Sequence, residues 1–272
     1  MYSSLYRQAW STSPSRSSCL LAYFCCSLQP IAYWLDTTKT GEDANKAKNT
    51  NKKIKQTKAH KMEKLAELYK RWKGTAPAMM AQLPEAGSNR KYYRLTGEDG
   101  ESVIGVVGNS RDENHTFIYL TRHFTERRLP VPRILAVDED ELRYLQTDLG
   151  STSLFDVLRG GRESGGRYNM REKQLLTAVI RELPNIQIRG ARGLDWQVCY
   201  PQPEFDVDSV LFDLNYFKYC FLKATELEFH ELKLEANFRL FAKDLTSEKS
   251  ESFLYRDFQA RNVMLDSNGK PY

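Results

Sequence analysis

The chain has 272 residues, of which 41% are hydrophobic and 28% are charged, and its formal net charge is +5. This length suits one large domain or two small lobes, and 15 Tyr and 13 Phe supply aromatic side chains for a core. Such a composition excludes collagen-like, low-complexity and wholly disordered chains.

The positive charge is concentrated in one polar segment. Residues 38–61 contain eight Lys against Glu42 and Asp43, a local balance of +6, and residues 1–37 add +1. Residues 62–272 therefore carry −2. A basic footprint is absent from this part of the sequence, so we expect no nucleic-acid partner for it.

Residues 1–61 differ in composition from the remainder. Their longest apolar run, Cys19–Cys26, is short for a membrane span of about 20 residues, and no clear small-residue cleavage site follows it. We interpret residues 1–61 as a disordered or spurious N-terminal extension with a Lys-rich linker, and expect no stable membrane association. The five widely spaced Cys indicate reduced thiols and a cytoplasmic location.

The first half of the remaining chain alternates between helix and strand patterns. Helical spacing of apolar residues predicts helices over 62–73 and 113–128. Residues 97–100 contain an Asp-Gly pair, which predicts a hairpin between two strands. The strand-like segments are 78–83, 91–95, 102–107, 134–137 and 144–146.

After Gly150 the pattern becomes mainly helical. Residues 160–166 are expected to form a flexible loop, and residues 253–265 an apolar strand on each side of a polar loop. The predicted helices are 154–158, 171–188 with an interruption at Pro184, 210–225 and 230–245. A small antiparallel sheet followed by a helical region predicts an α+β fold with two lobes.

One segment carries a pattern with chemical meaning, Tyr255-Arg-Asp-Phe-Gln-Ala-Arg-Asn262. Asp257 and Asn262 are five positions apart, and the apolar segment Val263–Leu265 follows. In phosphoryl transfer, an Asp meets the acceptor hydroxyl while an Asn holds a magnesium ion that neutralises phosphate charge. The alternative is structural: Asp257 and Arg256 would form a loop ion pair, and Asn262 would cap a turn.

At this point the chain resembles the aminoglycoside phosphotransferase family, which comprises kinase-like small-molecule phosphotransferases. It is most similar to the branch that includes bacterial kinases of cell-wall amino sugars. The resemblance covers nearly all of 62–272 and implies a protein-kinase-like two-lobed fold. Residues 62–147 would form the nucleotide-binding N-lobe, and residues 148–272 a partial C-lobe with the catalytic loop.

The resemblance also implies roles for particular residues. Asp257 would be the catalytic base or the residue that orients the hydroxyl, and Asn262 a ligand of Mg²⁺. The segments 129–138 and 144–150 would form the approach to the hinge, where backbone groups would receive the adenine of ATP. Further candidates are Gly87, Ser88, Asn89 and Gln146 for the nucleotide, and Asp213 and Gln259 for a sugar or aminoglycoside substrate. Gly87 could instead supply only a positive φ in a hairpin, and Asp213 could be a solvated helix residue.

Two features depart from the kinase pattern. The strand over 102–107 has no Lys, whereas protein kinases place one on their third strand, so Glu113 has no obvious Lys partner. The chain also ends at Tyr272, fifteen residues after Asp257, before the second metal-binding Asp that the family carries in an Asp-Phe-Gly or Asp-Phe-Gln context. We therefore expect a C-terminally truncated chain with an incomplete C-lobe and impaired phosphotransferase activity.

Two other functions remain open at this stage. A non-catalytic nucleotide-binding or regulatory pseudokinase-like module would explain the missing Asp and the missing Lys, although it would not explain why Asp257 and Asn262 are both present. A membrane-tethered interaction protein built on residues 1–61 is supported only by the short apolar run.

Overall fold

The computed structural model describes residues 44–84, 90–248 and 251–272, with side chains from Ala59 onward. Its internal contacts define two compact units. Of the described residues, the first unit holds 205–248 and 256–259, and the second unit holds the rest.

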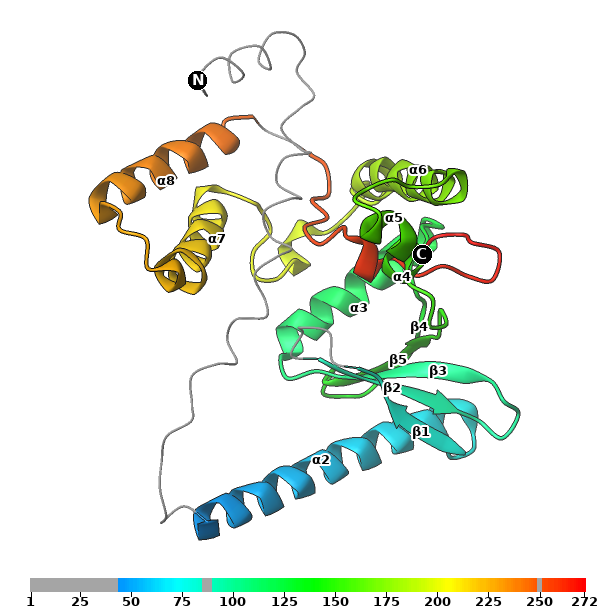
Figure 1. The fold of residues 1–272 in the computed structure, drawn as a ribbon. Coiled ribbons are helices and arrows are strands. Elements are labelled where there is room, and N and C mark those ends of the chain that lie inside the picture. The colour runs from blue at the N-terminus through cyan, green and yellow to red at the C-terminus, as the bar shows by residue number, and fades with distance from the viewer. Residues whose placement is uncertain (1–43, 85–89, 249–250) are drawn as a thin grey trace. The chain divides into compact units, whose positions relative to one another are not determined.

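A five-stranded antiparallel sheet is the centre of the second unit (Figure 1). The strand order is β1-β2-β3-β5-β4, so β3 lies in the middle. As predicted, the Asp99-Gly100 turn joins β2 to β3, and Gly100 has a φ of +78° that favours glycine. The strands are β1 Met79–Gln82, β2 Lys91–Thr96, β3 Ser102–Val107, β4 Ile134–Val137 and β5 Arg143–Thr147.

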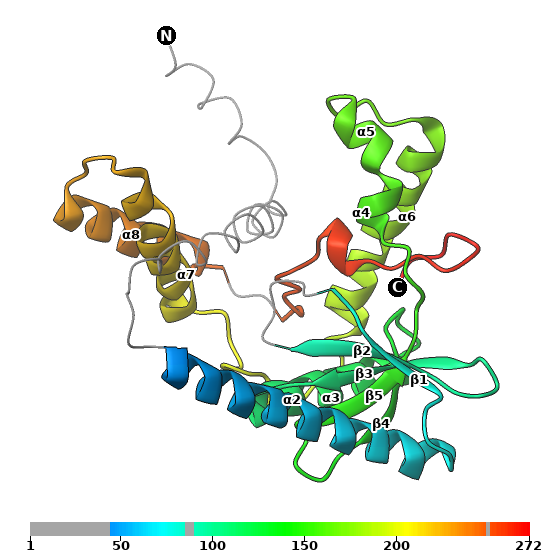
Figure 2. The ribbon, with the colours of Figure 1, turned by 60° about the horizontal axis from the view of Figure 1, so that its bottom comes forward.

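Helix α2, Ala44–Lys73, crosses one face of this sheet (Figure 2). Its Leu65, Leu68 and Tyr69 are buried against strand residues that include Leu95 and Leu145. The helix ends at Lys73 as predicted but begins well before Met62. Lys and Ala are common in the added segment and favour a helix without any apolar stripe, so part of the expected Lys-rich linker is helical.

Helix α3, Arg111–Glu126, covers the opposite face. Ile118 of α3 packs against Ile104 and Val106 of β3 and Tyr144 of β5. Because strand side chains alternate between faces, even-numbered residues of β3 and β5 face α3, and their odd-numbered neighbours, such as Val103 and Leu145, face α2.

Short helices follow the sheet in the second unit. They are α4 Leu154–Val157, α5 Arg159–Glu163, α6 Met170–Pro184, the π-helical turn η3 Asn185–Arg189 and the 3-10 turn η4 Trp196–Val198. The expected flexible loop at 160–166 is wrong in its first half, which belongs to α5. The buried carboxylate of Glu172 explains this, because it accepts the Gly161 N–H at 2.9 Å and closes the capping box of α6.

Polar contacts fasten residues 185–198 to α3, so this segment groups with the sheet although we expected the lobe boundary at residue 148. Thr116 Oγ1 donates to Val198 O at 2.5 Å, and Tyr119 Oη accepts the Asp195 N–H at 2.9 Å. His123 Nε2 lies 2.8 Å from Gly190 O. Burial lowers the pKa of His123, which favours the neutral ring with its proton on Nε2.

The first unit is built around α7, Val207–Cys220, and α8, Glu231–Leu245. Asp206 caps α7 and His230 caps α8, each through a hydrogen bond to a first-turn N–H. Between the two helices, the buried ammonium of Lys218 pairs with Glu235 and, at 3.6 Å, with Glu231. These helices match the predicted segments 210–225 and 230–245, apart from a break after Cys220, where the 3-10 turn η5, Leu222–Thr225, follows.

The segment that carries the Asp257 motif differs from the expected strand–loop–strand. Residues 253–255 form no strand; instead Phe253 and Tyr255 pack on the cluster of Phe124, Leu129 and Ile186. The later half is extended as predicted. Leu154 N donates to Val263 O at 2.9 Å and Leu265 N donates to Thr152 O at 2.9 Å, while Met264 and Tyr272 exchange two backbone hydrogen bonds.

Within residues 44–84, 90–248 and 251–272, no helix combines the length and the apolar character needed to cross a membrane.

Candidate functional site

The segment after β5 is tied to the sheet by the carboxylate of Asp148. Arg94 of β2 donates to it twice, from Nε at 2.6 Å and from Nη2 at 3.1 Å. Ser102 Oγ donates to the same carboxylate at 2.7 Å, and the Gly150 N–H at 2.9 Å. The guanidinium also reaches Gly150 O at 2.9 Å. Strands β2 and β3 therefore fix the chain at 148–150.

The charge state of Asp148 follows from these contacts. Burial alone would raise its pKa, but the hydrogen bonds from Arg94, Ser102 and the Gly150 backbone outweigh burial and hold the pKa below its usual range. The carboxylate is thus ionised near neutral pH, and the bidentate pair with Arg94 restricts its geometry.

Leu149, inside this fixed segment, presents open backbone groups. Within the described residues, neither its N–H nor its C=O has a hydrogen-bond partner. An adjacent donor and acceptor on one chain segment can bind the edge of a purine, which carries both kinds of group. The expected contact of adenine with the segment 144–150 stays a prediction.

Gln146, the predicted nucleotide residue, lies on the α3 face of β5, in register with Ile104 of β3. Its Oε1 and the Tyr144 hydroxyl are buried without a hydrogen-bond partner in the described part of the chain. Burial also raises the pKa of Tyr144, so the phenol is neutral and able to donate. Buried unsatisfied polar atoms are rare, and these two lie on the same face of β5.

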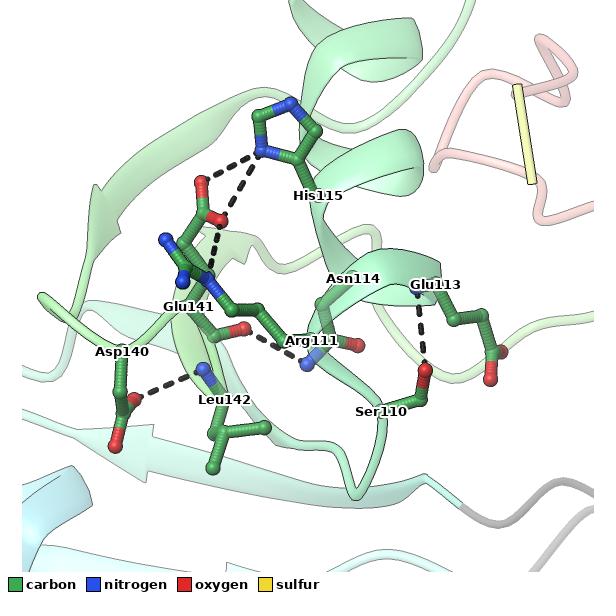
Figure 3. Close-up of polar contacts among 8 residues, drawn as sticks. All are labelled: Ser110, Arg111, Glu113, Asn114, His115, Asp140, Glu141 and Leu142. Carbon is green, nitrogen blue, oxygen red and sulfur yellow. Dashed lines mark hydrogen bonds and ion pairs between the residues drawn. The ribbon is translucent and has the colours of Figure 1, made fainter. Parts of the chain in front are cut away.

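The first turn of α3 contacts Arg90, which precedes β2, and the turn before β5. Figure 3 shows the contacts with the turn. Ser110 caps the helix by accepting the Glu113 N–H at 3.3 Å. Asn114 is buried and donates from Nδ2 to Glu141 O at 2.8 Å, while its Oδ1 accepts from Arg90 Nε at 3.1 Å. Glu113 has no obvious Lys partner in the sequence. In the structure it pairs with Arg90, whose Nη2 lies 3.0 Å from Glu113 Oε1.

The turn before β5 completes this junction, as Figure 3 shows. His115 Nδ1 lies 2.9 Å from Glu141 Oε1, and Arg111 Nε lies 3.4 Å from Glu141 Oε2. The contact with His115 is the main reason that the pKa of Glu141 is lowered. Together with Asn114, these pairs hold α3 to the β4–β5 turn, which fixes the helix over the sheet.

Asp257 lies in the first unit with the residues around it. Its side chain is exposed, and its backbone C=O accepts the Gln259 N–H at 2.9 Å. Arg256 pairs with Asp213 of α7 at 2.5 Å and lies 5.3 Å from the centre of the Phe205 ring. The carboxylate of Asp213, a candidate substrate residue, is thus engaged with the residue preceding Asp257.

Asn262 lies in the second unit, at the end of the 3-10 turn η6, Ala260–Asn262. Its side chain is exposed, and the buried Val263 and Leu265 anchor the chain directly after it. Because Asp257 belongs to the other unit, their pairing across a metal stays a prediction. The candidate phosphate-binding residues Gly87, Ser88 and Asn89 lie outside the described residues.

Sequence reasoning missed the polar residues that support the site: Arg94 with Asp148, and Arg90 with Asn114. Apolar or exposed residues alternate with Arg90, Tyr92 and Arg94 in the sequence. This alternation indicates that the three side chains share one face of the strand, but it does not identify their partners. These partners are 24 and 54 positions away in the chain, separations that periodicity does not resolve.

An antiparallel sheet with a helix across it, an open backbone segment after its fifth strand and an Asp-x-x-x-x-Asn loop define a kinase-like α+β phosphotransferase. The sequence model of the phosphotransferase enzyme family, APH, matches residues 80–271, well over half of the chain. The chain belongs to this family, whose members transfer phosphoryl groups to small molecules. No curated protein matches it.

Proposed function

We propose that this protein binds ATP with Mg²⁺ and is built to transfer the terminal phosphoryl group to a hydroxyl of an amino sugar or an aminoglycoside. Within the family, we assign it to the branch of bacterial cell-wall amino-sugar kinases, with a cytoplasmic location. The observation that carries the nucleotide assignment is the backbone of Leu149, whose N–H and C=O have no partner among the described residues, in a segment that Asp148 fixes to the sheet.

Each candidate residue has a role in this proposal. The Asp257 carboxylate accepts or orients the acceptor proton, and exposure leaves it accessible to a substrate. Gly87, Ser88 and Asn89 contribute backbone N–H groups to the phosphates, and Gln259 contacts the substrate. For Asp213 the ion pair with Arg256 favours a positioning role, in which it anchors the catalytic loop on α7.

Magnesium fits the donor set near the loop, because amide and carboxylate oxygens are its usual protein ligands. Asn262 would hold it, and the bound ion would neutralise charge on the transferring phosphate. Asp266 is the acidic residue that follows Asn262 within the described residues 251–272. Its Oδ1 accepts the N–H groups of Asn268 and Lys270, each at 2.9 Å, and so serves its own turn.

We expect the chain to bind MgATP with one-to-one stoichiometry but to transfer phosphate slowly, because the carboxylate of Asp266 serves its own turn and not a metal ion. Calorimetry measures binding, and labelled phosphate from ATP measures transfer to a panel of amino sugars and aminoglycosides. Slow transfer should fall by roughly a hundredfold or more in Asp257→Asn, since loss of a general base costs about that factor. Asp208→Asn, an exposed acid of α7, is the matched control and should transfer like the unmodified chain.

The alternative is a non-catalytic nucleotide-binding module, favoured by the absence of a Lys from β3 and by the engagement of Asp266 in its turn. In that case the chain would bind MgATP, and Asp257→Asn would not change the labelling of any acceptor. A chain that binds no nucleotide would contradict both functions.

A further inference from the structure

The nucleotide site proposed above lacks a cation at the usual place. Kinase sites pair a strand lysine with an acidic residue of the following helix, and the lysine contacts the nucleotide phosphates. Here β3 reads Ser-Val-Ile-Gly-Val-Val and has no basic residue. The acidic residue is nevertheless present, because Glu113 lies in the first turn of α3.

The basic partner of Glu113 comes from the start of β2 instead. Arg90 Nη2 lies 3.0 Å from Glu113 Oε1 and donates to Glu113 O at 3.2 Å. Arg90 Nε donates to Asn114 Oδ1 at 3.1 Å, and the guanidinium carbon is 5.0 Å from the centre of the Phe117 ring. Four contacts from one helix therefore orient a single guanidinium.

The face and the sequence position of Arg90 both suit a nucleotide contact. Its contacts with α3 place it on the face of the sheet that carries Tyr144 and Gln146. In the sequence it directly follows Gly87-Ser-Asn89, the candidate phosphate turn. The Glu113 side chain is 43% exposed and the Arg90 side chain 13%, so solvent reaches the ion pair mainly from the Glu113 side.

We propose that Arg90 supplies the positive charge that binds the nucleotide phosphates, in the place of the missing strand lysine, with Glu113 and Asn114 orienting it. This inference rests on the proposed nucleotide-binding function. A guanidinium presents its N–H donors in a rigid planar fork that matches the geometry of phosphate oxygens. Phosphate is a favoured partner of such a planar donor set.

The test compares two probes by calorimetry, MgATP and adenosine, on the full chain. In Arg90→Gln, we expect MgATP binding to weaken about ten- to a hundredfold, the cost of one charge-assisted hydrogen bond, while adenosine binding is unchanged. Arg90→Lys keeps the charge and should recover part of the MgATP affinity. Arg122→Gln, an exposed residue of α3, is the matched control and should leave both affinities unchanged.

Glu113→Gln separates a phosphate contact from a structural ion pair. It keeps Arg90 and its bonds to Asn114 and to the Glu113 backbone, so MgATP affinity should stay within about threefold of the unmodified chain. It also provides a readout if Arg90→Gln does not fold. A Glu113→Gln loss as large as that expected for Arg90→Gln would overturn the inference, because the ion pair itself would then be what matters.

Other outcomes are equally distinct. If Arg90→Gln binds MgATP as well as the unmodified chain, or loses adenosine and MgATP in equal proportion, Arg90 does not contact phosphate and the inference is wrong, although nucleotide binding stands. If the unmodified chain binds neither probe, the proposed function fails first, and the inference fails with it.

Discussion

Arg94→Ala is expected to lower the free energy of unfolding by about 2–3 kcal/mol and to weaken nucleotide binding at the same time. The substitution removes two hydrogen bonds to Asp148 and the bond to Gly150 O. The Asp148 side chain is only 6% exposed, so its charge would lose its main partner. Breaking a fully buried pair costs about 3–5 kcal/mol, and the partial exposure of Arg94 reduces that figure.

Nucleotide binding should suffer in Arg94→Ala because Leu149 would lose its fixed position. Chemical denaturation measures the stability change, and calorimetry with adenosine measures the binding change. Arg122→Ala should change neither. A stability loss below about 0.5 kcal/mol, the size typical of an exposed pair, would contradict the role of Asp148 as the anchor of this segment.

The contact between Arg94 and Asp148 predicts that the stability of the fold depends on pH. Asp148 has an ordinary pKa of 3.8 and a lower one in the folded chain. Its stabilising contribution is therefore complete above pH 3.8 and is lost as the pH falls through the folded pKa. In Asp148→Asn this part of the acid sensitivity should disappear, which denaturation curves between about pH 2 and 5 would show.

Leu65→Ala is expected to lower the free energy of unfolding by about 3 kcal/mol. Leu65 is fully buried between α2 and the sheet, and removing a buried leucine side chain costs about 2.7–5 kcal/mol with the cavity that it leaves. Thermal or chemical unfolding would measure the loss. Leu232→Ala, at a residue of α8 that is 76% exposed, is the control and should cost little.

Gly105 offers a second test of the same packing. A Cβ at this position would lie 2.6 Å from Leu95 Cδ1 and 2.9 Å from Leu65 Cδ2, so Gly105→Ala should destabilise the chain by about 1–3 kcal/mol through overpacking. Combined with Leu65→Ala, the added methyl group would enter the space left by the leucine. The double substitution should therefore cost less than the sum of the two, and strict additivity would contradict direct contact.

The elements of the sheet could be predicted from the sequence because their signals are local. Period-two alternation and the Asp99-Gly100 turn are set by residues within a few positions, and β3 and β4 match their predicted bounds. The start of α2 could not be found in this way, since a polar Lys-rich helix has no apolar period to detect. Residues 253–255 show the opposite case: Phe253 and Tyr255 are apolar and partly buried against the cluster of Phe124, Leu129 and Ile186, but the segment forms no strand.

The candidate site could be predicted only in part. A spacing rule pointed to Asp257 and Asn262, and a resemblance pointed to Gln146. The groups that orient the site depend on contacts distant in sequence, such as Arg94 with Asp148, 54 positions apart. The pair of Asp213 with Arg256, 43 positions apart, is a further contact of this kind, and the contact of Asp213 with a substrate stays a prediction.

Hydrogen–deuterium exchange with and without adenosine tests most directly whether the base binds after β5. Without ligand, the Leu149 amide should exchange quickly, because it has no partner among the described residues. Saturating adenosine should slow exchange in peptides that cover 146–150 and leave those of α7 and α8 unchanged. Binding detected by calorimetry together with unaltered exchange over 146–150 would contradict a nucleotide site at this segment.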